Sequence, residues 1–89
     1  MHRSRLSAEL EAQLKGLLKT DRRLYEALLS KIEEIVSSPD VGHYKNLKAP
    51  LQSFKRVHVM KSFVLIFSYD KTQDAIKFHK LGHHDKVYR

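Results

Sequence analysis

Apolar residues recur every three or four positions in the first half of the chain, which predicts two amphipathic helices. Ser7 is suited to cap the first helix, and Thr20 and Asp21 interrupt the pattern where a second helix can be capped. The second helix is expected from about residue 22 to residue 37. The apolar positions are Leu6, Leu10, Leu14, Leu17 and Leu18 in the first helix and Leu24, Leu28, Ile32, Ile35 and Val36 in the second. Two helices joined by a tight turn predict a helical hairpin that covers an apolar surface.

The period changes to two residues in the second half, after a breaker cluster at 37–42 and a polar connection. Residues 54–59 and 74–81 alternate between apolar and polar, whereas residues 63–69 are apolar on both faces, as in a central strand. Short links between these segments predict an antiparallel meander, because parallel pairing needs long crossovers. Residues 1–6 are a candidate for a short edge strand.

The expected fold is therefore α+β, with an N-terminal helical hairpin packed on a small antiparallel sheet in the order (β)ααβββ. The 89 residues suit one domain, 1–89. Val57 and Val59 are expected to face the helices, which leaves Arg56 and His58 on the other face. Arg56 and His58 then lie about two strand spacings, ~10 Å, from the last strand, and side chains of these two strands can line one phosphate-sized pocket.

Positive charge is concentrated in the second half of the chain. Of the formal net charge of +7, residues 1–38 contribute +1 and residues 41–89 contribute +7, with Asp40 supplying −1. A concentrated positive field favours a polyanion, whose phosphates are neutralised with release of counterions. The alternative is a basic surface that serves solubility. No basic amphipathic helix carries the charge, which disfavours binding to a membrane surface.

Other features point to a cytoplasmic protein. The chain has no cysteine, so neither a disulfide framework nor a thiolate metal site is available. No apolar signal stretch follows residues 1–5, and the longest apolar run, residues 63–67, is too short to span a bilayer.

Groups able to transfer protons gather near the end of the chain, in residues 82–88 (GHHDKVY). Histidine titrates near neutral pH, so two histidines can share the acid and base roles when a ribose 2′-hydroxyl attacks its own phosphate. Cations would stabilise the transition state, and an aromatic ring would hold an unstacked base. The set with these capacities is His58, His84, Arg56, Lys55 and Tyr88. From spacing alone, a solvated tail and surface histidines are the alternatives.

Metal binding is the other chemistry to consider here, because imidazole is a common zinc ligand. His79, His83 and His84 are close in sequence, but His79 falls within a strand and only Asp85 supplies a nearby carboxylate. We expect no metal and no cofactor.

Two segments resemble the RelE/ParE superfamily of toxins. Residues 53–67 (SFKRVHVMKSFVLIF) are similar to its YafQ branch, which has an aromatic-basic pair, a strand histidine, then a turn into an apolar strand. Residues 78–88 (FHKLGHHDKVY) match a last strand that ends in glycine, one residue, a histidine, and an aromatic four positions later. The resemblance covers nearly the whole chain. It implies a toxin that cleaves mRNA in the ribosomal A site without metal and is silenced by a small antitoxin wrapped around it, the toxin being a monomer when free.

By position, His58 and His84 match the histidines of that branch, Tyr88 matches its near-terminal aromatic, and Lys45 or His43 falls near another functional histidine. The candidate set comprises the catalytic residues His58, His84, Arg56 and Tyr88, the RNA-phosphate ligands Lys45, Lys48, Lys55, Lys61 and Lys86, and the supporting residues His43, His83 and Asp85. Which histidine is the base and which is the acid is left open.

The chain also departs from the family pattern. Ser62 and Arg56 stand where the YafQ branch has acidic residues, and Val64 stands where RelE has a functional arginine. These departures keep two alternatives open, a ParE-like inhibitor of DNA gyrase and an inactive RNA-binding relative. Inhibition of gyrase would survive loss of both histidines, and an RNA-binding domain would bind RNA in a salt-dependent way without cutting it.

Overall fold

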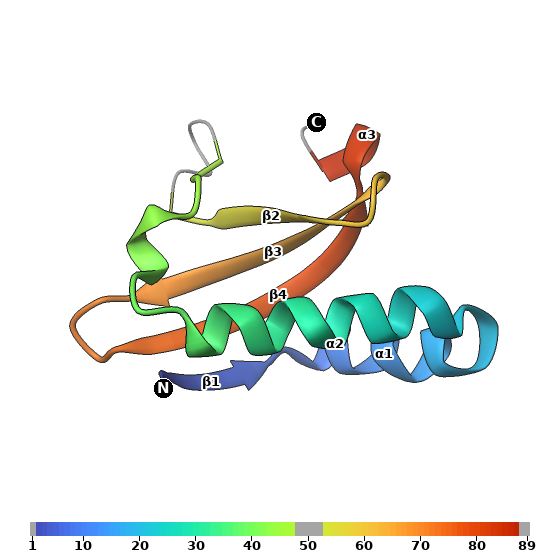
Figure 1. Cartoon of the computed structure of the whole chain (residues 1–89), viewed down its shortest axis with the longest axis horizontal. Helices are drawn as coiled ribbons and strands as arrows, with labels where there is room; N and C mark the ends of the chain where they lie inside the picture. The colour runs from blue at the N-terminus through green and yellow to red at the C-terminus, as the bar shows by residue number, and fades with distance from the viewer. Residues whose placement is uncertain (1, 48–52, 88–89) are drawn as a thin grey trace.

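The computed structural model describes residues 2–47 and 53–87, with side chains up to residue 85. Helices and strands follow the expected order (Figure 1). The elements are β1 (Arg3–Leu6), α1 (Ala8–Thr20), α2 (Arg22–Ser37), the 3₁₀ helix η1 (Val41–His43), β2 (Lys55–Val59), β3 (Phe63–Asp70), β4 (Ala75–His83) and the short helix α3 (His84–Val87).

The strands form one four-stranded sheet in the order β1-β4-β3-β2. β3 pairs antiparallel with both β2 and β4, which confirms the predicted meander and the central position of β3. β1 pairs parallel with β4, from Arg3 opposite Ala75 to Leu6 opposite Phe78, so the whole sheet is mixed rather than purely antiparallel. The helical hairpin and two strands separate β1 from β4 in the sequence, and this length supplies the crossover that parallel pairing needs.

Both helices begin at the predicted caps. The Ser7 hydroxyl accepts a hydrogen bond from the Leu10 N–H (3.0 Å), and the Asp21 carboxylate accepts one from the Leu24 N–H (3.1 Å). Each bond satisfies one amide that the first turn of a helix leaves without a partner, which typically contributes about 1 kcal/mol. These caps set where the hairpin starts and turns.

The helical hairpin covers one face of the sheet (Figure 1). Leu10, Leu28 and Ile35 of the helices are fully buried against Phe67 and Phe78 of the sheet. Burying large apolar side chains is the main stabilising contribution to the fold, on the order of 2 kcal/mol for each. This face is the main core.

The other face of the sheet, which we call the second face, carries a smaller apolar cluster. Val64 and Ile66 of β3 are buried there with Leu47, and Phe54 packs against them. The segment before β2 lies beside that strand, because the Leu47 N–H donates to the Phe54 carbonyl (2.9 Å) and the Arg56 N–H donates to the Lys45 carbonyl (3.0 Å). β3 is thus covered on both faces, as its unbroken apolar run predicts.

No helix in the described part of the chain is both long enough and apolar enough to cross a membrane.

Candidate active site

An irregularity in β4 decides which face the last strand presents. Phe67 of β3 lies opposite Phe78, but Ile66 lies opposite Lys80, so His79 is an extra residue in β4. Such a bulge exchanges the faces of every residue beyond it. Lys80 and Gly82 therefore lie on the second face, whereas strict alternation from Phe78 would direct them toward the helices.

The bulge brings the end of β4 to the side of the sheet that carries His58. His58 and Gly82 flank Val64, since Val64 is the register partner of both. The chain then enters α3 at His84, whose N–H donates to the Ser62 carbonyl (2.8 Å) in the β2–β3 turn. α3 is thereby held beside that turn (Figure 1).

The rings of His58 and His84 stack on one another. Their centroids are 5.2 Å apart and their planes are inclined by 26°. His58 is exposed, and 44% of the His84 side chain is exposed. The structure therefore brings together the two histidines singled out from the sequence, at a distance that allows both to contact one phosphate group from solvent; their catalytic roles stay a prediction.

Asp85 lies beside both neighbouring histidines in the first turn of α3. Its carboxylate oxygens are 3.5 Å from Nδ1 of His84 and 3.9 Å from Nδ1 of His83. His83 is the last residue of β4, and its ring contacts the edge of Phe63 at a centroid distance of 5.6 Å. Since His83 and Gly82 point to opposite faces of β4, His83 is directed away from His58. Asp85 is thus placed to orient His84.

Arg56 shares the second face with His58. It is half-buried and lies opposite Ile66, two residues from His58 along β2, a distance of about 7 Å. Lys61 is exposed in the β2–β3 turn, next to Ser62, whose carbonyl accepts the hydrogen bond from the His84 N–H. Both cations are placed where they can contact a phosphate bound at the histidine pair.

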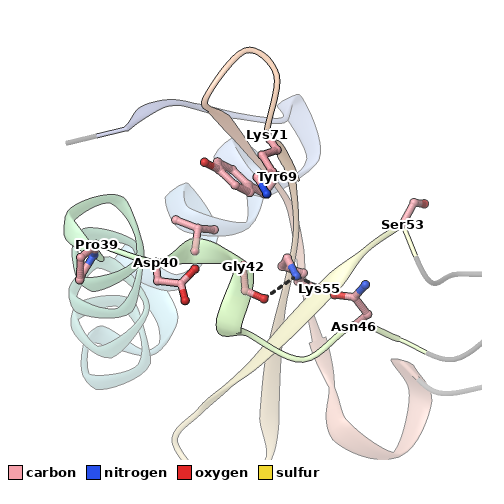
Figure 2. Close-up of a pocket in the computed structure, with 9 residues that line it drawn as sticks. Pro39, Asp40, Gly42, Asn46, Ser53, Lys55, Tyr69 and Lys71 are labelled. Carbon is pink, nitrogen blue, oxygen red and sulfur yellow. Dashed lines mark hydrogen bonds between the residues drawn. The ribbon is translucent and has the colours of Figure 1, made fainter.

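Lys55 lies on the opposite face of β2 from Arg56 and His58. Its ammonium group donates to the Asn46 side-chain oxygen (2.7 Å) and to the carbonyls of Tyr44 (3.1 Å) and Gly42 (3.4 Å). Figure 2 shows this side chain directed at the loop, with the bond to Gly42 dashed. The structure therefore does not bring Lys55 to the histidine pair. Its bonds hold residues 39–46, which contain η1 and which we call the η1 loop, against β2.

The cavity drawn in Figure 2 is separate from the histidine pair. It has a volume of about 610 Å³ and is lined by Lys55, Tyr69, Lys71 and residues of the η1 loop. Of the candidate site residues that the structure describes, it shares only Lys55.

Lys45 and His43 lie in the segment that precedes β2. Lys45 is exposed, and its carbonyl accepts a hydrogen bond from the Arg56 N–H, which places the Lys45 backbone beside β2. His43 is exposed on η1, where Nδ1 contacts the Asp40 carbonyl and the ring lies 4.1 Å from that of Tyr44. Lys48, Tyr88 and the side chain of Lys86 lie outside the described residues.

Two histidines that sequence reasoning left aside are engaged by neighbouring groups. His2 contacts Asp74 Oδ1 through Nδ1 and the Ser38 carbonyl through Nε2, both at 2.6 Å. The bond to Ser38, and then the one to Asp74, raise the pKa of His2. No local pattern signals this contact, because 72 residues separate His2 from Asp74.

The other is His79, the bulged residue of β4. It is half-buried, its Nε2 lies 2.8 Å from the Ser68 hydroxyl, and its ring contacts the edge of Phe54 at 4.9 Å. Burial, and next the charges of Lys77 and Arg5, lower the pKa of His79, while Glu9 acts in the opposite direction. The rings of His2 and His79 therefore contact neighbouring protein groups and are not part of the stacked pair of His58 and His84.

Within residues 2–47 and 53–87, no three histidine or carboxylate side chains are grouped so as to hold a metal ion.

Comparison with known proteins gives the chain its relatives. No family model matches the sequence. RelE4 of Methanocaldococcus jannaschii, which is assigned as a toxin, is 42% identical over 89 residues, covering 100% of this chain and 93% of RelE4.

Solved structures of toxins share the fold. A metal-bound toxin from Helicobacter pylori has a TM-score of 0.74 at 23% identity, with 98% of this chain and 99% of that chain covered. YafQ from Escherichia coli has a TM-score of 0.65 at 16% identity over the whole of both chains. In the YoeB–YefM complex from Staphylococcus aureus the matched chain has a TM-score of 0.73 at 13% identity, with 94% and 98% covered.

Proposed function

Because this chain belongs to the RelE/ParE superfamily of toxins, we propose that it is the toxin of a type II toxin–antitoxin pair and a cytoplasmic endoribonuclease that cleaves mRNA on the ribosome. The observation that carries the nuclease activity is the stacked pair of His58 and His84. The identity of 42% to RelE4 over the whole chain supports the assignment as a toxin.

The proposed reaction needs only proton transfer and charge stabilisation. One histidine takes the proton of a ribose 2′-hydroxyl, whose oxygen forms a bond to the adjacent phosphorus. The bond from phosphorus to the 5′-oxygen breaks, and the other histidine donates a proton to that oxygen. The products are a cyclic phosphate, which can open to a 3′-phosphate, and a 5′-hydroxyl.

In this proposal, cations on the same side of the sheet stabilise the negative charge of the transition state. Arg56 and Lys61 lie near His58 and the β2–β3 turn, where they can neutralise the phosphate oxygens. Asp85 orients His84 through the contact at 3.5 Å. In this proposal Tyr88, by its position in the sequence, stacks on an unpaired base.

A protein partner follows from the same family. The solved YoeB chain from Staphylococcus aureus is in complex with YefM, and the RelBE2 structure from Mycobacterium tuberculosis is a toxin–antitoxin complex. We propose that this chain is silenced in the same manner by a small antitoxin. Its +7 charge suits an acidic partner segment.

The test is translation in vitro with mRNA ends mapped by primer extension. Wild-type protein is expected to cut the mRNA, and the double variant His58→Ala His84→Ala is expected to leave it intact. Lys15→Ala, on the exposed face of α1, serves as a folded control. Intact mRNA with the wild type, or undiminished cleavage by the double variant, would contradict the proposal. Inhibition of gyrase supercoiling that survives loss of both histidines would support the ParE-like alternative instead.

A further inference from the structure

Among the described residues, the second face of the sheet carries Arg3, Arg5, Lys77 and Lys80 besides Arg56, and Arg3 donates to the Gln73 carbonyl (2.9 Å). Arg5 of β1 lies opposite Lys77 of β4, and Lys77 lies opposite Ser68 of β3. The bulge then turns Lys80 to the same face, opposite Ile66, whose partner on the other side is Arg56. We call Arg5, Lys77 and Lys80 the basic track. It lies on β1 and β4, and Arg56 and His58 on β2 lie two strand spacings, about 10 Å, beyond β4.

The basic track has no ion-pair partner among the described residues. The ion pairs of that part of the chain involve other side chains. Arg5 and Lys77 are register partners, and two like charges directly opposite each other on neighbouring strands destabilise a sheet. Asp70, a carboxylate on this face two residues from Ser68 along β3, accepts hydrogen bonds from the N–H groups of Thr72 and Gln73. An anion bound between the two cations would remove their repulsion.

The field of these cations is felt at a neighbouring side chain. Lys77 and Arg5, after burial, lower the pKa of His79, and Glu9 of α1 opposes them. Since His79 is half-buried, the charges act on it through a medium that screens less than water. The region around the bulge is therefore electropositive.

The β1 end of the track borders a hollow. Its volume is about 460 Å³, and its charged lining residues are the cations Arg3, Arg5 and Lys77 and the carboxylate Asp70, with Ser68 and Gln73 beside them. Lysine, arginine and serine side chains are the donors that commonly contact phosphate oxygens. Three cations thus face one carboxylate in this hollow, so it carries a net positive charge that suits an anion.

We propose that the hollow and the basic track bind the phosphodiester backbone of a single RNA strand. Contacts to phosphate position a strand without reading its sequence, so affinity along the track is expected to be independent of base sequence. The strand is then led across the second face, and its next phosphates reach Arg56 and the histidine pair. Only this last step rests on the proposed nuclease function; binding of RNA by the track does not.

The test is a titration of a fluorescein-labelled single-stranded RNA, methylated at its 2′-hydroxyls so that it cannot be cut, followed by anisotropy at several salt concentrations. Each phosphate contact on a single strand contributes about 0.7 to the slope of log K against log salt. The double variant Arg5→Ala Lys77→Ala is therefore expected to bind more weakly, with a slope smaller by about 1.4. The matched control Lys15→Ala Lys19→Ala removes the same charge from α1 and is expected to keep the slope.

A second readout separates phosphate binding from a general effect of charge. A phosphate next to Lys77 offsets the positive field, so bound RNA is expected to raise the pKa of His79 in the wild type, followed by NMR of its ring protons. The Arg5→Ala Lys77→Ala variant is expected to lose most of this change. Thermal unfolding of each variant checks that it is folded.

The outcomes distinguish the two proposals. An unchanged slope in the track variant, or an equal change in the α1 control, overturns the track whatever happens to cleavage. The track is also overturned if the variant keeps its affinity for RNA but loses affinity for an acidic antitoxin, which would assign the surface to a protein. A salt slope that falls as expected, together with mRNA that stays intact, supports the track and contradicts only the nuclease.

Discussion

Histidines lie near both ends of the central strand, His2 at one end and the pair of His58 and His84 at the other, and they are held in different ways. At the end near the β3–β4 turn, His2 has an acceptor on each ring nitrogen, and 14% of its side chain is exposed. At the other end, His58 and His84 stack face to face and are open to solvent. The same residue type, in one small sheet, thus serves as a structural joint in one place and as an accessible pair in the other.

The difference shows how a structural histidine can be told from a candidate catalyst. His2 joins the start of β1 to the Ser38 carbonyl after α2 and to Asp74 in the β3–β4 turn, where Tyr69 also donates to Asp74 (2.8 Å). A ring with both nitrogens bonded to protein acceptors has no site left for a substrate proton. His58 and His84 present their rings to solvent, where a substrate can reach them.

Replacing the exposed pair has the largest expected effect. His58→Ala and His84→Ala are each expected to lower the rate of mRNA cleavage roughly 100-fold or more, because each removes a proton-transfer group. Both positions are on the surface, so the free energy of unfolding is expected to change by only about 0.5 kcal/mol. Primer extension and urea unfolding measure the two quantities. A large loss of stability in either variant would place that histidine with His2 as a structural residue.

The joint at His2, formed by its hydrogen bonds to Ser38 and Asp74, is expected to affect the pH dependence of stability rather than cleavage. The pKa of His2 is raised above 6.5 in the folded protein, so its stabilising contribution is full below pH 6.5 and is lost as pH rises through the folded pKa. Urea midpoints measured from about pH 6 to pH 9 are expected to fall for the wild type across this window and to fall less for His2→Gln. Cleavage by His2→Gln is expected to stay near the wild-type rate.

Two other groups act in different windows and serve as controls. The pKa of Asp74 is lowered from 3.8 by its bonds to Tyr69 and His2, so its contribution is present above pH 3.8 and is lost in stronger acid. The pKa of His79 is lowered from 6.5, so its contribution is present above pH 6.5 and is lost as pH falls. His79→Gln is expected to reduce only the acid loss. An identical pH profile in His2→Gln and wild type would mean that the joint contributes nothing.

The smallest effect is expected at Asp85. Its contact with His84 is exposed, and exposed ion pairs contribute about 1 kcal/mol or less. Asp85→Asn, which keeps the shape of the side chain, is therefore expected to slow cleavage by about fivefold at most. Single-turnover rates measure this change. A loss as large as that of His84→Ala would make Asp85 an essential part of the acid–base pair.

Local patterns determined most of the secondary structure. The caps at Ser7 and Asp21, the two helices and the three-stranded meander all follow from side chains within a few residues of one another. Capping and amphipathic spacing are local interactions, so they are visible in the sequence. The apolar run of β3 likewise predicted a strand covered on both faces.

Tertiary structure alone decided the pairing of distant segments. β1 pairs parallel with β4, although most of the chain separates them in the sequence. His2 contacts Asp74, and the Lys55 side chain binds the η1 loop rather than lying beside the histidines. Each of these contacts joins residues whose own neighbourhoods carry no sign of the partner. Their formation depends on how whole elements pack.

The histidine pair shows both contributions. From the sequence alone, His58 and His84 are candidates because of their residue type and a family resemblance. The distance between their rings depends on the register of the strands. The extra residue at His79 exchanges the faces of β4, and the amide of His84 is then held by Ser62. A bulge of one residue is a cooperative outcome of packing on both faces of a sheet, so alternation in the sequence did not show it.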